Sequence, residues 1–287
     1  MRYFISRLGC LALLTLLGMG CGPDTSTTAR QGIITMGPHL TETVFALGKG
    51  DDVIAVGRFD DYPPEIEALP KAGGYIDPDL EKITMLQPGL LILPGAQPEL
   101  TDFAVQQGFK VLNVHMDNFA TITAGVTTLG DALGCSDVAK ELVTRFNAER
   151  DALEERLKTV QRPRVLIITT RESHDLNSLY TVGGTSFVSE IVSLAGGDNV
   201  FQSETQPYFE ASKESVVAAA PEVIIEFHAG SDLTKEEAQA FKDDWNVLAT
   251  LPAVKTGRIV LVTPSHALRP GPRIVEIAES MAAELHP

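Results

Sequence analysis

The sequence predicts an α/β protein built as two lobes, each with a mainly parallel sheet, that are joined by one long rigid helix. Three observations support this fold class. Apolar runs of strand length alternate with helical patterns, one segment occurs twice, and an uninterrupted helical pattern lies between the two copies. The chain has 287 residues, of which 44% are apolar and 21% charged, so it is long enough to bury a substantial core.

Seven short apolar runs bounded by turn residues are predicted to be strands. Helical patterns separate them, and strands separated by helices indicate parallel sheets with helical crossovers. The runs are Ile33–Met36, Val53–Val56, Leu90–Leu93, Val111–Val114, Val165–Thr170, Val223–Phe227 and Ile259–Val262.

An internal repeat pairs residues 79–93 with residues 212–225. Each copy contains a glutamate, Glu81 or Glu214, placed seven residues before a proline that is followed by a short apolar strand. In both copies a short amphipathic helix opens with a carboxylate, which the helix dipole favours, and stops at the proline. The repeat predicts two lobes of similar build.

Between the copies, residues 136–161 are predicted to form one helix with Ser136 as its N-cap. At 1.5 Å per residue it would span roughly 39 Å, which is longer than one lobe needs. We therefore expect an N-terminal lobe at 31–135, a connecting helix at 136–161 and a C-terminal lobe at 162–287. The alternative is a long packing helix inside a single domain.

Residues 1–20 are predicted to be a signal peptide. Arg2 and Arg7 precede the apolar run Leu8–Leu17, which is shorter than the ~20 residues of a membrane span but suits the core of an export signal.

Cys21 is the expected lipidation site. It follows a small residue, Gly20, and precedes the polar stretch 21–30, an arrangement that resembles a bacterial lipoprotein processing site with a flexible tether. The alternative is ordinary cleavage near Gly20. We expect an exported protein, periplasmic or at the cell surface, that lipidated Cys21 anchors to the membrane.

The charge balance excludes one class of partner. With 23 Lys+Arg and 38 Asp+Glu the formal net charge is −15, and without residues 1–20 the chain keeps 21 basic and 38 acidic residues, or −17. Because such an acidic surface repels phosphate backbones, we expect no nucleic-acid partner.

The cysteine content excludes a disulfide in the fold. Cys10 is removed with the signal peptide and Cys21 is the expected lipidation site, so Cys135 is the only free thiol that remains and no internal disulfide is possible.

Four motifs, in this order and spacing, resemble the helical-backbone substrate-binding proteins of ABC importers, a family that takes up cobalamin, ferric siderophores or haem. They are Ile33–Gly48, Asp60–Glu65, Leu69–Tyr75 and Arg269–Ile274. The Asp-Tyr-Pro-Pro stretch is most similar to the cobalamin-binding branch. The resemblance implies a ligand cleft between the lobes, little domain closure, and delivery of ligand to a membrane permease dimer. We expect a monomer that binds a metal chelate as cargo, with no resident cofactor.

The same resemblance implies a role for the repeated glutamates. Their counterparts, one on each lobe, meet arginines of the two permease subunits, so Glu81 and Glu214 are the expected docking residues. The alternative is that both simply favour a helix N-terminus.

Ligands of open α/β sheets sit beyond the carboxyl ends of the strands. Residues at those ends include five of the six histidines, among them His39, His115, His174 and His228. Together they could bind a bare transition metal or reach the metal of a chelate. No particular residue is assigned to a metal from the sequence.

Aromatic side chains suit a macrocycle with an apolar body. Tyrosines matching the cobalamin-binding pattern are Tyr62, Tyr75, Tyr180 and Tyr208. Where that branch typically has Trp, this chain has Tyr75, Tyr208 and His266, and Arg269 aligns with a cleft arginine. We therefore expect a corrinoid or a related iron chelate, with a ferric siderophore, haem or a bare transition-metal ion as alternatives.

An enzyme is the rival class, and it has little support. The chain has no Gly-x-Ser-x-Gly, His-Glu-x-x-His, Cys-x-x-Cys or Walker-type loop. Asp60 and Asp61 could form a catalytic carboxylate pair, but neighbouring residues of an extended loop point apart. We expect no enzymatic activity. A lipid-anchored scavenger or sensor without an importer remains the third possibility.

Overall fold

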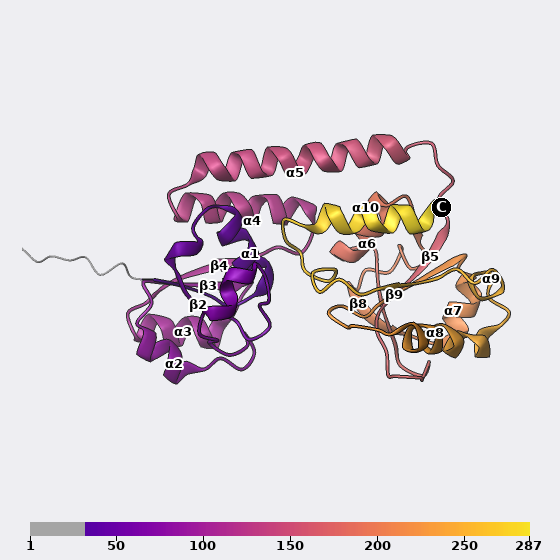
Figure 1. Ribbon diagram of the computed structural model, residues 1–287, viewed down its shortest axis with the longest axis horizontal. Helices are drawn as coiled ribbons and strands as arrows, with labels where there is room; N and C mark the ends of the chain where they lie inside the picture. The colour runs from indigo at the N-terminus through magenta and orange to yellow at the C-terminus, as the bar shows by residue number, and fades with distance from the viewer. Residues whose placement is uncertain (1–31) are drawn as a thin grey trace, which may run out of the picture.

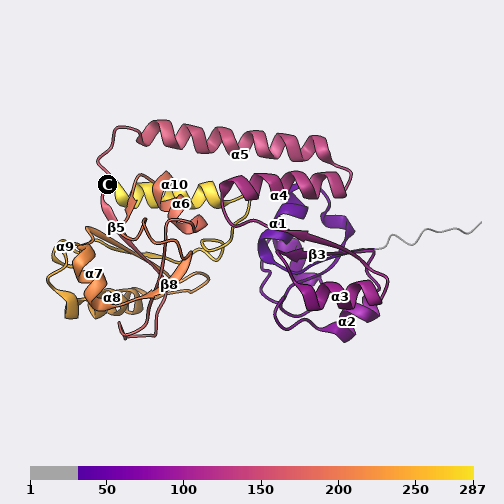
Figure 2. The ribbon, with the colours of Figure 1, turned by 180° about the vertical axis from the view of Figure 1, so that it is seen from behind.

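The protein, seen here as a computed structural model that describes residues 32–287, folds into two α/β lobes that lie side by side (Figure 1). Helix α5 (Ser136–Leu157) runs along one side of both lobes, as the view from behind also shows (Figure 2). The predicted fold class is confirmed. The predicted signal peptide, the tether and Cys21 lie outside the described residues.

The N-terminal lobe contains a four-stranded, fully parallel sheet of order β2-β1-β3-β4. Each of its four predicted strands is present within one residue of its expected bounds. Its elements are β1 (Ile33–Thr35), α1 (Pro38–Ala46), β2 (Val53–Val56), α2 (Leu80–Leu86), β3 (Leu90–Pro94), α3 (Pro98–Gln106), β4 (Lys110–Val114) and α4 (Phe119–Ala132).

The C-terminal lobe contains a mixed sheet of order β10-β9-β5-β6-β8, with β7 also paired to β5. Strands β10, β9 and β5 are parallel, as predicted, whereas β6 pairs antiparallel with both β5 and β8. Its elements are β5 (Arg164–Thr170), β6 (Leu179–Val182), α6 (Phe187–Leu194), β7 (Asp198–Asn199), β8 (Tyr208–Ala211), α7 (Lys213–Ala219), β9 (Val223–Phe227), α8 (Lys235–Asp243), α9 (Pro252–Lys255), β10 (Ile259–Val262) and α10 (Ile274–Leu285).

Alternate residues of the buried strands enter different cores. In β5, Val165 and Ile167 belong to one cluster, and Leu166 and Ile168 to another. The first cluster continues from α1 and α4 in one lobe, under α5, to α6 and α10 in the other. The two lobes therefore share one apolar core on the side of α5.

Helix α5 begins at residue 136 as predicted, but its N-cap residue and its end differ from the prediction. Cys135, not Ser136, occupies the N-cap position, because the Ser136 hydroxyl donates to Asp131 at 2.6 Å instead of capping. The helix ends at Leu157 rather than at 161, because the chain turns there to enter β5. The Val160 N–H donates to the Leu157 carbonyl in this turn. None of the helices within residues 32–287 is both long enough and apolar enough to cross a membrane.

A second segment, residues 263–273, also joins the lobes, and we call it the strap. It leaves β10 in the C-terminal lobe, contacts the N-terminal lobe, and returns through α10. Two arginines hold it there: Arg273 binds Glu42 of α1 through two hydrogen bonds of 2.7 and 2.9 Å, and Arg269 binds Asp61. With two crossings and a shared core, the lobes have little freedom to swing apart.

Candidate ligand-binding site

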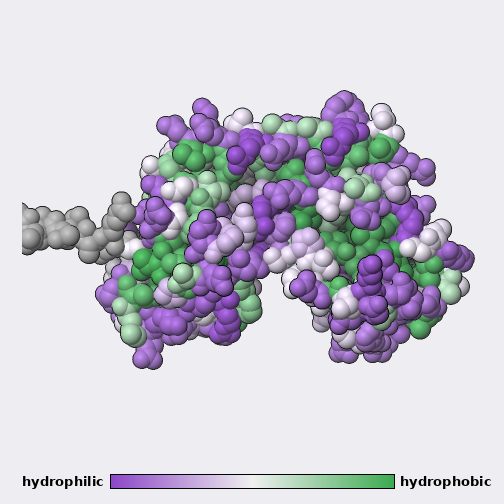
Figure 3. Space-filling view, viewed as in Figure 1, coloured by the Kyte–Doolittle hydropathy of each residue, from purple (hydrophilic) through white to green (hydrophobic). Residues whose placement is uncertain are grey.

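A hollow of about 420 Å³ lies at the carboxyl ends of all four strands of the N-terminal sheet. The surface is hollowed between the two lobes on the side away from α5 (Figure 3). The hollow, which we call the cleft, is lined by Met36, Gly37, Pro38, His39, Gly57, Arg58, Phe59, Asp60, Gly74, Tyr75, Pro94, Gly95, Val114, Met116, Asp117, Leu268, Arg269 and Pro270. It obeys the rule for ligand sites in open α/β sheets.

Short strand-to-helix turns bring these residues together. Pro38 is the first residue of α1 and suits that position because it lacks an N–H, so His39 follows immediately at the strand end. Gly95 turns the chain at the end of β3 with a φ of 60°, in the left-handed region that favours glycine. Phe59 and Tyr75 lie on the loops after β2, and both keep exposed ring area at the cleft.

His39 is neutral at physiological pH. Burial, together with the positive charge of Arg269, lowers the pKa of His39 to about 4. A neutral imidazole carries one acceptor nitrogen, so His39 can accept a hydrogen bond or ligate a metal.

Asp60 forms part of the cleft wall and is only 4% exposed. Its Oδ2 accepts from the Thr41 hydroxyl and from the Gly57 N–H, at 3.2 Å for the latter, whereas no described residue donates to its Oδ1. Burial raises the pKa of Asp60 to about 6, against the opposing effects of these hydrogen bonds and of Lys71 and Arg269. Asp60 thus has one carboxylate oxygen that is buried and has no hydrogen-bond partner among the described residues.

Both arginines of the cleft wall are already paired with carboxylates. Arg269 Nη2 lies 2.9 Å from Asp61 Oδ2, and Arg269 Nη1 also binds Asp61. The same Nη1 lies 3.6 Å from Glu42 Oε1. Arg58 pairs with Asp77 at 2.7 Å. Hydrogen bonds from Arg269 hold the pKa of Asp61 below its usual value, so that pair stays charged on both sides.

The antiparallel strand pair β6 and β8 supplies two of the predicted tyrosines. Val182 pairs with Tyr208 and Tyr180 with Glu210, which places both tyrosines on the same face of this strand pair. Burial and the carboxylate of Asp117, a residue of the cleft wall, raise the pKa of Tyr208 to about 12. Tyr208 therefore approaches the cleft from the C-terminal lobe, while no contact of Tyr180 with the cleft residues is observed among the described residues.

Two further predicted residues lie beside the cleft rather than in its wall. The Tyr62 ring packs under the Arg273 guanidinium at 3.9 Å from its centroid. His266 lies in the strap, where burial and then Arg273 lower its pKa. Of the predicted set, the structure brings His39, Tyr75 and Arg269 into the wall, and Tyr208 lies within electrostatic reach of Asp117 in that wall.

The histidines do not gather around a metal position. His228 Nε2 is hydrogen-bonded to the carboxylate of Glu226 at 2.8 Å, in a buried network of the C-terminal lobe that includes Arg171 and Trp245. The exposed His174 lies 3.2 Å from Asp244 of the same lobe. Within residues 32–287 no three His, Cys, Asp or Glu side chains are placed to hold a metal ion. His174 and His228 instead contact carboxylates of their own lobe, Asp244 and Glu226.

Glu81 and Glu214 occupy equivalent positions in α2 and α7. Each is the second helical residue and is exposed, behind an N-cap, Asp79 or Ser212, that accepts a backbone hydrogen bond. Neither glutamate makes a hydrogen bond or ion pair with a described residue. Helices α2 and α7 belong to different lobes, and both lie away from α5 (Figure 1).

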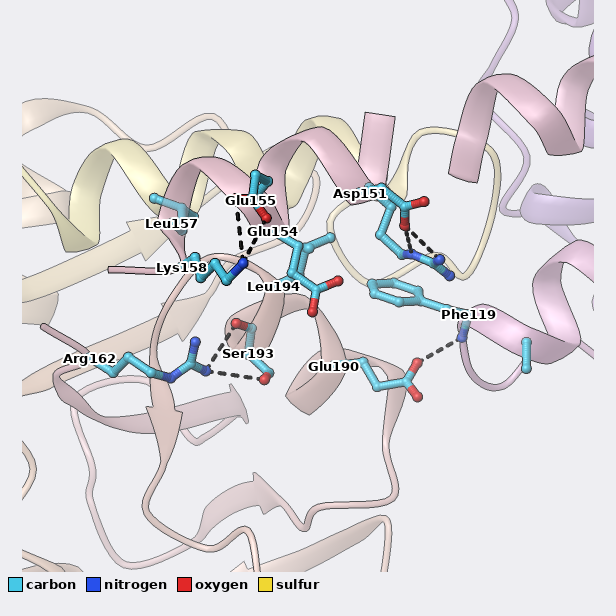
Figure 4. Close-up of a pocket in the computed structure, with 12 residues that line it drawn as sticks. Phe119, Asp151, Glu154, Glu155, Leu157, Lys158, Arg162, Glu190, Ser193 and Leu194 are labelled. Atoms are coloured by element: carbon cyan, nitrogen blue, oxygen red, sulfur yellow. Dashed lines mark hydrogen bonds and ion pairs between the residues drawn. The ribbon is translucent and has the colours of Figure 1, made fainter. Parts of the chain in front are cut away.

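A larger hollow of about 840 Å³ lies under α5, between α6 and the start of α4 (Figure 4). Its charged side chains pair with their neighbours: Arg150 with Asp151, Lys158 with Glu155, and Arg162 with Asp198. Glu190 of α6 accepts from the Phe119 N–H at 2.7 Å, which ties α4 to the C-terminal lobe. This hollow is therefore part of the link between the lobes and does not sit at the strand ends.

The strand-end rule covers residues 59–62 and so includes Asp60, but Asp117 is not identified as a cleft residue from the sequence. The signal for Asp117 is its position three residues beyond the end of β4, where the strand-end rule applies. Nothing in the sequence indicates that Tyr208 lies near Asp117.

Two α/β lobes, a helix that joins them and a cleft at the strand ends together define a two-lobed solute-binding protein. A family model described as "Periplasmic binding protein" matches residues 33–265, and the chain belongs to that family. The predicted resemblance to substrate-binding proteins of ABC importers is confirmed.

Individual relatives are similar over most of their length. The chain is 27% identical over 260 residues to an uncharacterized ABC transporter substrate-binding lipoprotein, YvrC, of Bacillus subtilis. The aligned region covers 89% of this chain and 80% of the relative. It is 29% identical over 260 residues to a vitamin B12-binding protein of Vibrio parahaemolyticus, with 87% and 88% covered. The solved haem-binding protein HutB of Vibrio cholerae is similar in fold, with a TM-score of 0.79, 20% identity, and 90% and 100% covered.

Proposed function

We propose that this chain is a lipid-anchored substrate-binding protein of an ABC importer, which captures a corrinoid or a related iron chelate in the cleft and delivers it to a permease dimer. The observation that carries the proposal is the cleft itself, where Phe59 and Tyr75 keep exposed ring surface at the strand ends. Such surface suits a large flat macrocycle.

The relatives support this choice of ligand class, because one is named for vitamin B12 and a structural neighbour for haem. Their family contains binding proteins, which favours a binding role over an enzymatic one. The name of the Bacillus subtilis relative supports export and a lipid anchor at Cys21. The bare-metal alternative lacks a convergent ligand set within the described residues.

Calorimetric titration of three variants tests the ligand class. If ring faces hold a macrocycle, Tyr75→Ala and Tyr208→Ala should each weaken binding by about 1–3 kcal/mol through lost contact area. His39→Ala should matter less. The titrants are cobinamide, haemin, a ferric siderophore and zinc. Tyr180→Phe, on the same face of the β6–β8 strand pair as Tyr208, is the control. Zinc binding that requires His39 and ignores both tyrosines would contradict the proposal.

A further inference from the structure

Arg269 of the strap is bound by the N-terminal lobe through both terminal nitrogens of its guanidinium. Its Nη2 donates to Asp61 Oδ2 at 2.9 Å and to the Phe59 carbonyl at 3.4 Å. Its Nη1 also donates to Asp61 and lies 3.6 Å from Glu42 Oε1. Both nitrogens therefore face acceptors of this chain, and only 16% of the side chain is exposed.

The charges around Arg269 balance one another. Glu42, which is buried, also accepts two hydrogen bonds from Arg273, at 2.7 and 2.9 Å. Two guanidinium groups thus face the two carboxylates of Glu42 and Asp61, and these four groups carry no net charge. An anionic ligand could pair with Arg269 only by displacing Asp61, which would break a two-pronged, charge-assisted contact.

The loop that Arg269 contacts carries an aromatic side chain of the cleft. The Phe59 ring is 63% exposed and lines the cleft. Lys71 holds the next residue of this loop within the N-terminal lobe, with its Nζ 2.7 Å from the Asp60 carbonyl. Arg269 holds the same loop from the strap. A loop that is ordered before the ligand arrives avoids the entropy loss of being ordered during binding.

We propose, resting on the function proposed above, that Arg269 is a positioning residue of the cleft. It fixes residues 59–61 against the strap, so that the Phe59 ring is already in place in the empty protein, and it does not neutralise charge on the chelate. The strap thereby helps to build the half of the site that the N-terminal lobe provides. The contribution of Arg269 to affinity should be similar for a chelate with carboxylates and for one without.

Calorimetric titration with two chelates separates positioning from charge pairing. Haemin carries two carboxylates, and dicyanocobinamide carries none. Arg269→Met removes the guanidinium, whereas Asp61→Ala removes its two-pronged partner and frees it. If Arg269 acts through the loop, each variant should weaken every chelate that the wild-type chain binds by roughly three- to thirtyfold. The double variant should then bind no more weakly than the weaker single variant, because both changes break one contact.

Hydrogen–deuterium exchange of the chelate-free protein tests the loop itself. Amides of residues 57–62 should exchange about tenfold faster in Arg269→Met and in Asp61→Ala, while those of β1 and β3 stay protected. A general loss of stability would instead speed exchange in the strands as well. Arg162→Met is the matched control, because Arg162 pairs with Asp198 at 2.7 Å and neither residue lines the cleft. It should change neither the affinities nor the exchange of the loop.

Tighter binding of haemin by Asp61→Ala, or a loss in Arg269→Met that is confined to haemin, overturns the inference in favour of charge pairing with the ligand. Additive losses in the double variant, unchanged affinities, or unchanged exchange of residues 57–62 in Arg269→Met overturn it as well. The proposed function fails by a different result, when the wild-type chain binds neither of these chelates nor a ferric siderophore. The exchange measurement needs no ligand, so it still decides whether Arg269 holds the loop.

Discussion

Burial acts on three titratable side chains of the ligand site in the same way, because it favours the uncharged form of each. It lowers the pKa of His39 to about 4 and raises those of Asp60 to about 6 and Tyr208 to about 12. His39 and Tyr208 are therefore neutral across the physiological range. Asp60 is the one of the three that changes charge near neutrality.

A stability measurement follows from the raised pKa of Asp60. A carboxyl whose pKa is higher in the folded chain, about 6 against 3.8, stabilises the fold below pH 4 and loses that contribution as the pH rises through 6. Lys71 and Arg269 face it and reduce the effect. Urea unfolding at pH 4 and pH 7.5 should show that wild type loses about 2–3 kcal/mol relative to Asp60→Asn over this interval. Parallel pH dependences for the two proteins would contradict the assignment.

At the scale of elements, the repeat is reproduced down to its helix ends. Gln87 and Ala220 close α2 and α7 in the left-handed region, with φ of 46° and 44°, each directly before a proline. This conformation costs a residue with a Cβ roughly 1–2 kcal/mol. Ala220→Gly should therefore raise the free energy of unfolding by about 0.5–1 kcal/mol in chemical denaturation, after the entropic cost of glycine. The same exchange at Ala218, inside α7, should lower it by about 1 kcal/mol, and two effects of equal sign would refute the interpretation.

The elements also show what the sequence can and cannot predict. The seven predicted strands are all present because buried parallel strands are continuous apolar runs. Strands β6, β7 and β8 were missed, since they are short and partly exposed, with Tyr180 and Tyr208 on an open face. In the ligand site, His39 and Arg269 could be predicted because each lies just beyond the end of a predicted strand. The pairing of Arg269 with Asp61, 208 residues apart, could not be predicted, because no local pattern encodes a contact at that separation.

At the scale of the whole molecule, the two exposed glutamates test docking. Charge reversal at both positions, Glu81→Lys with Glu214→Lys, should abolish uptake of the chelate by cells and leave its affinity in calorimetry unchanged. Exposed pairs contribute only ~0–1 kcal/mol each, so the loss reflects a wrong orientation on the permease. Glu236→Lys is the matched control, because Glu236 is also the exposed second residue of a helix, α8. Uptake that survives the double reversal would rule out docking through this pair.

The anchor is tested by fractionation. Cys21→Ser should move the protein from the membrane fraction to the soluble exported fraction, since a single thioether-linked lipid site would be lost. Ligand affinity should stay the same, because Cys21 precedes the folded lobes. Unchanged partitioning would exclude lipidation at this residue.

The apolar core shared by the two lobes has a consequence for how empty and loaded copies of the protein compete for the permease. If the empty and the loaded protein differ little in shape, both present Glu81 and Glu214 at the same spacing. Empty copies then occupy permeases as readily as loaded ones do. Uptake should accordingly depend on the fraction of copies that carry cargo and not on their number, so a cell that overproduces this protein when chelate is scarce would slow its own import.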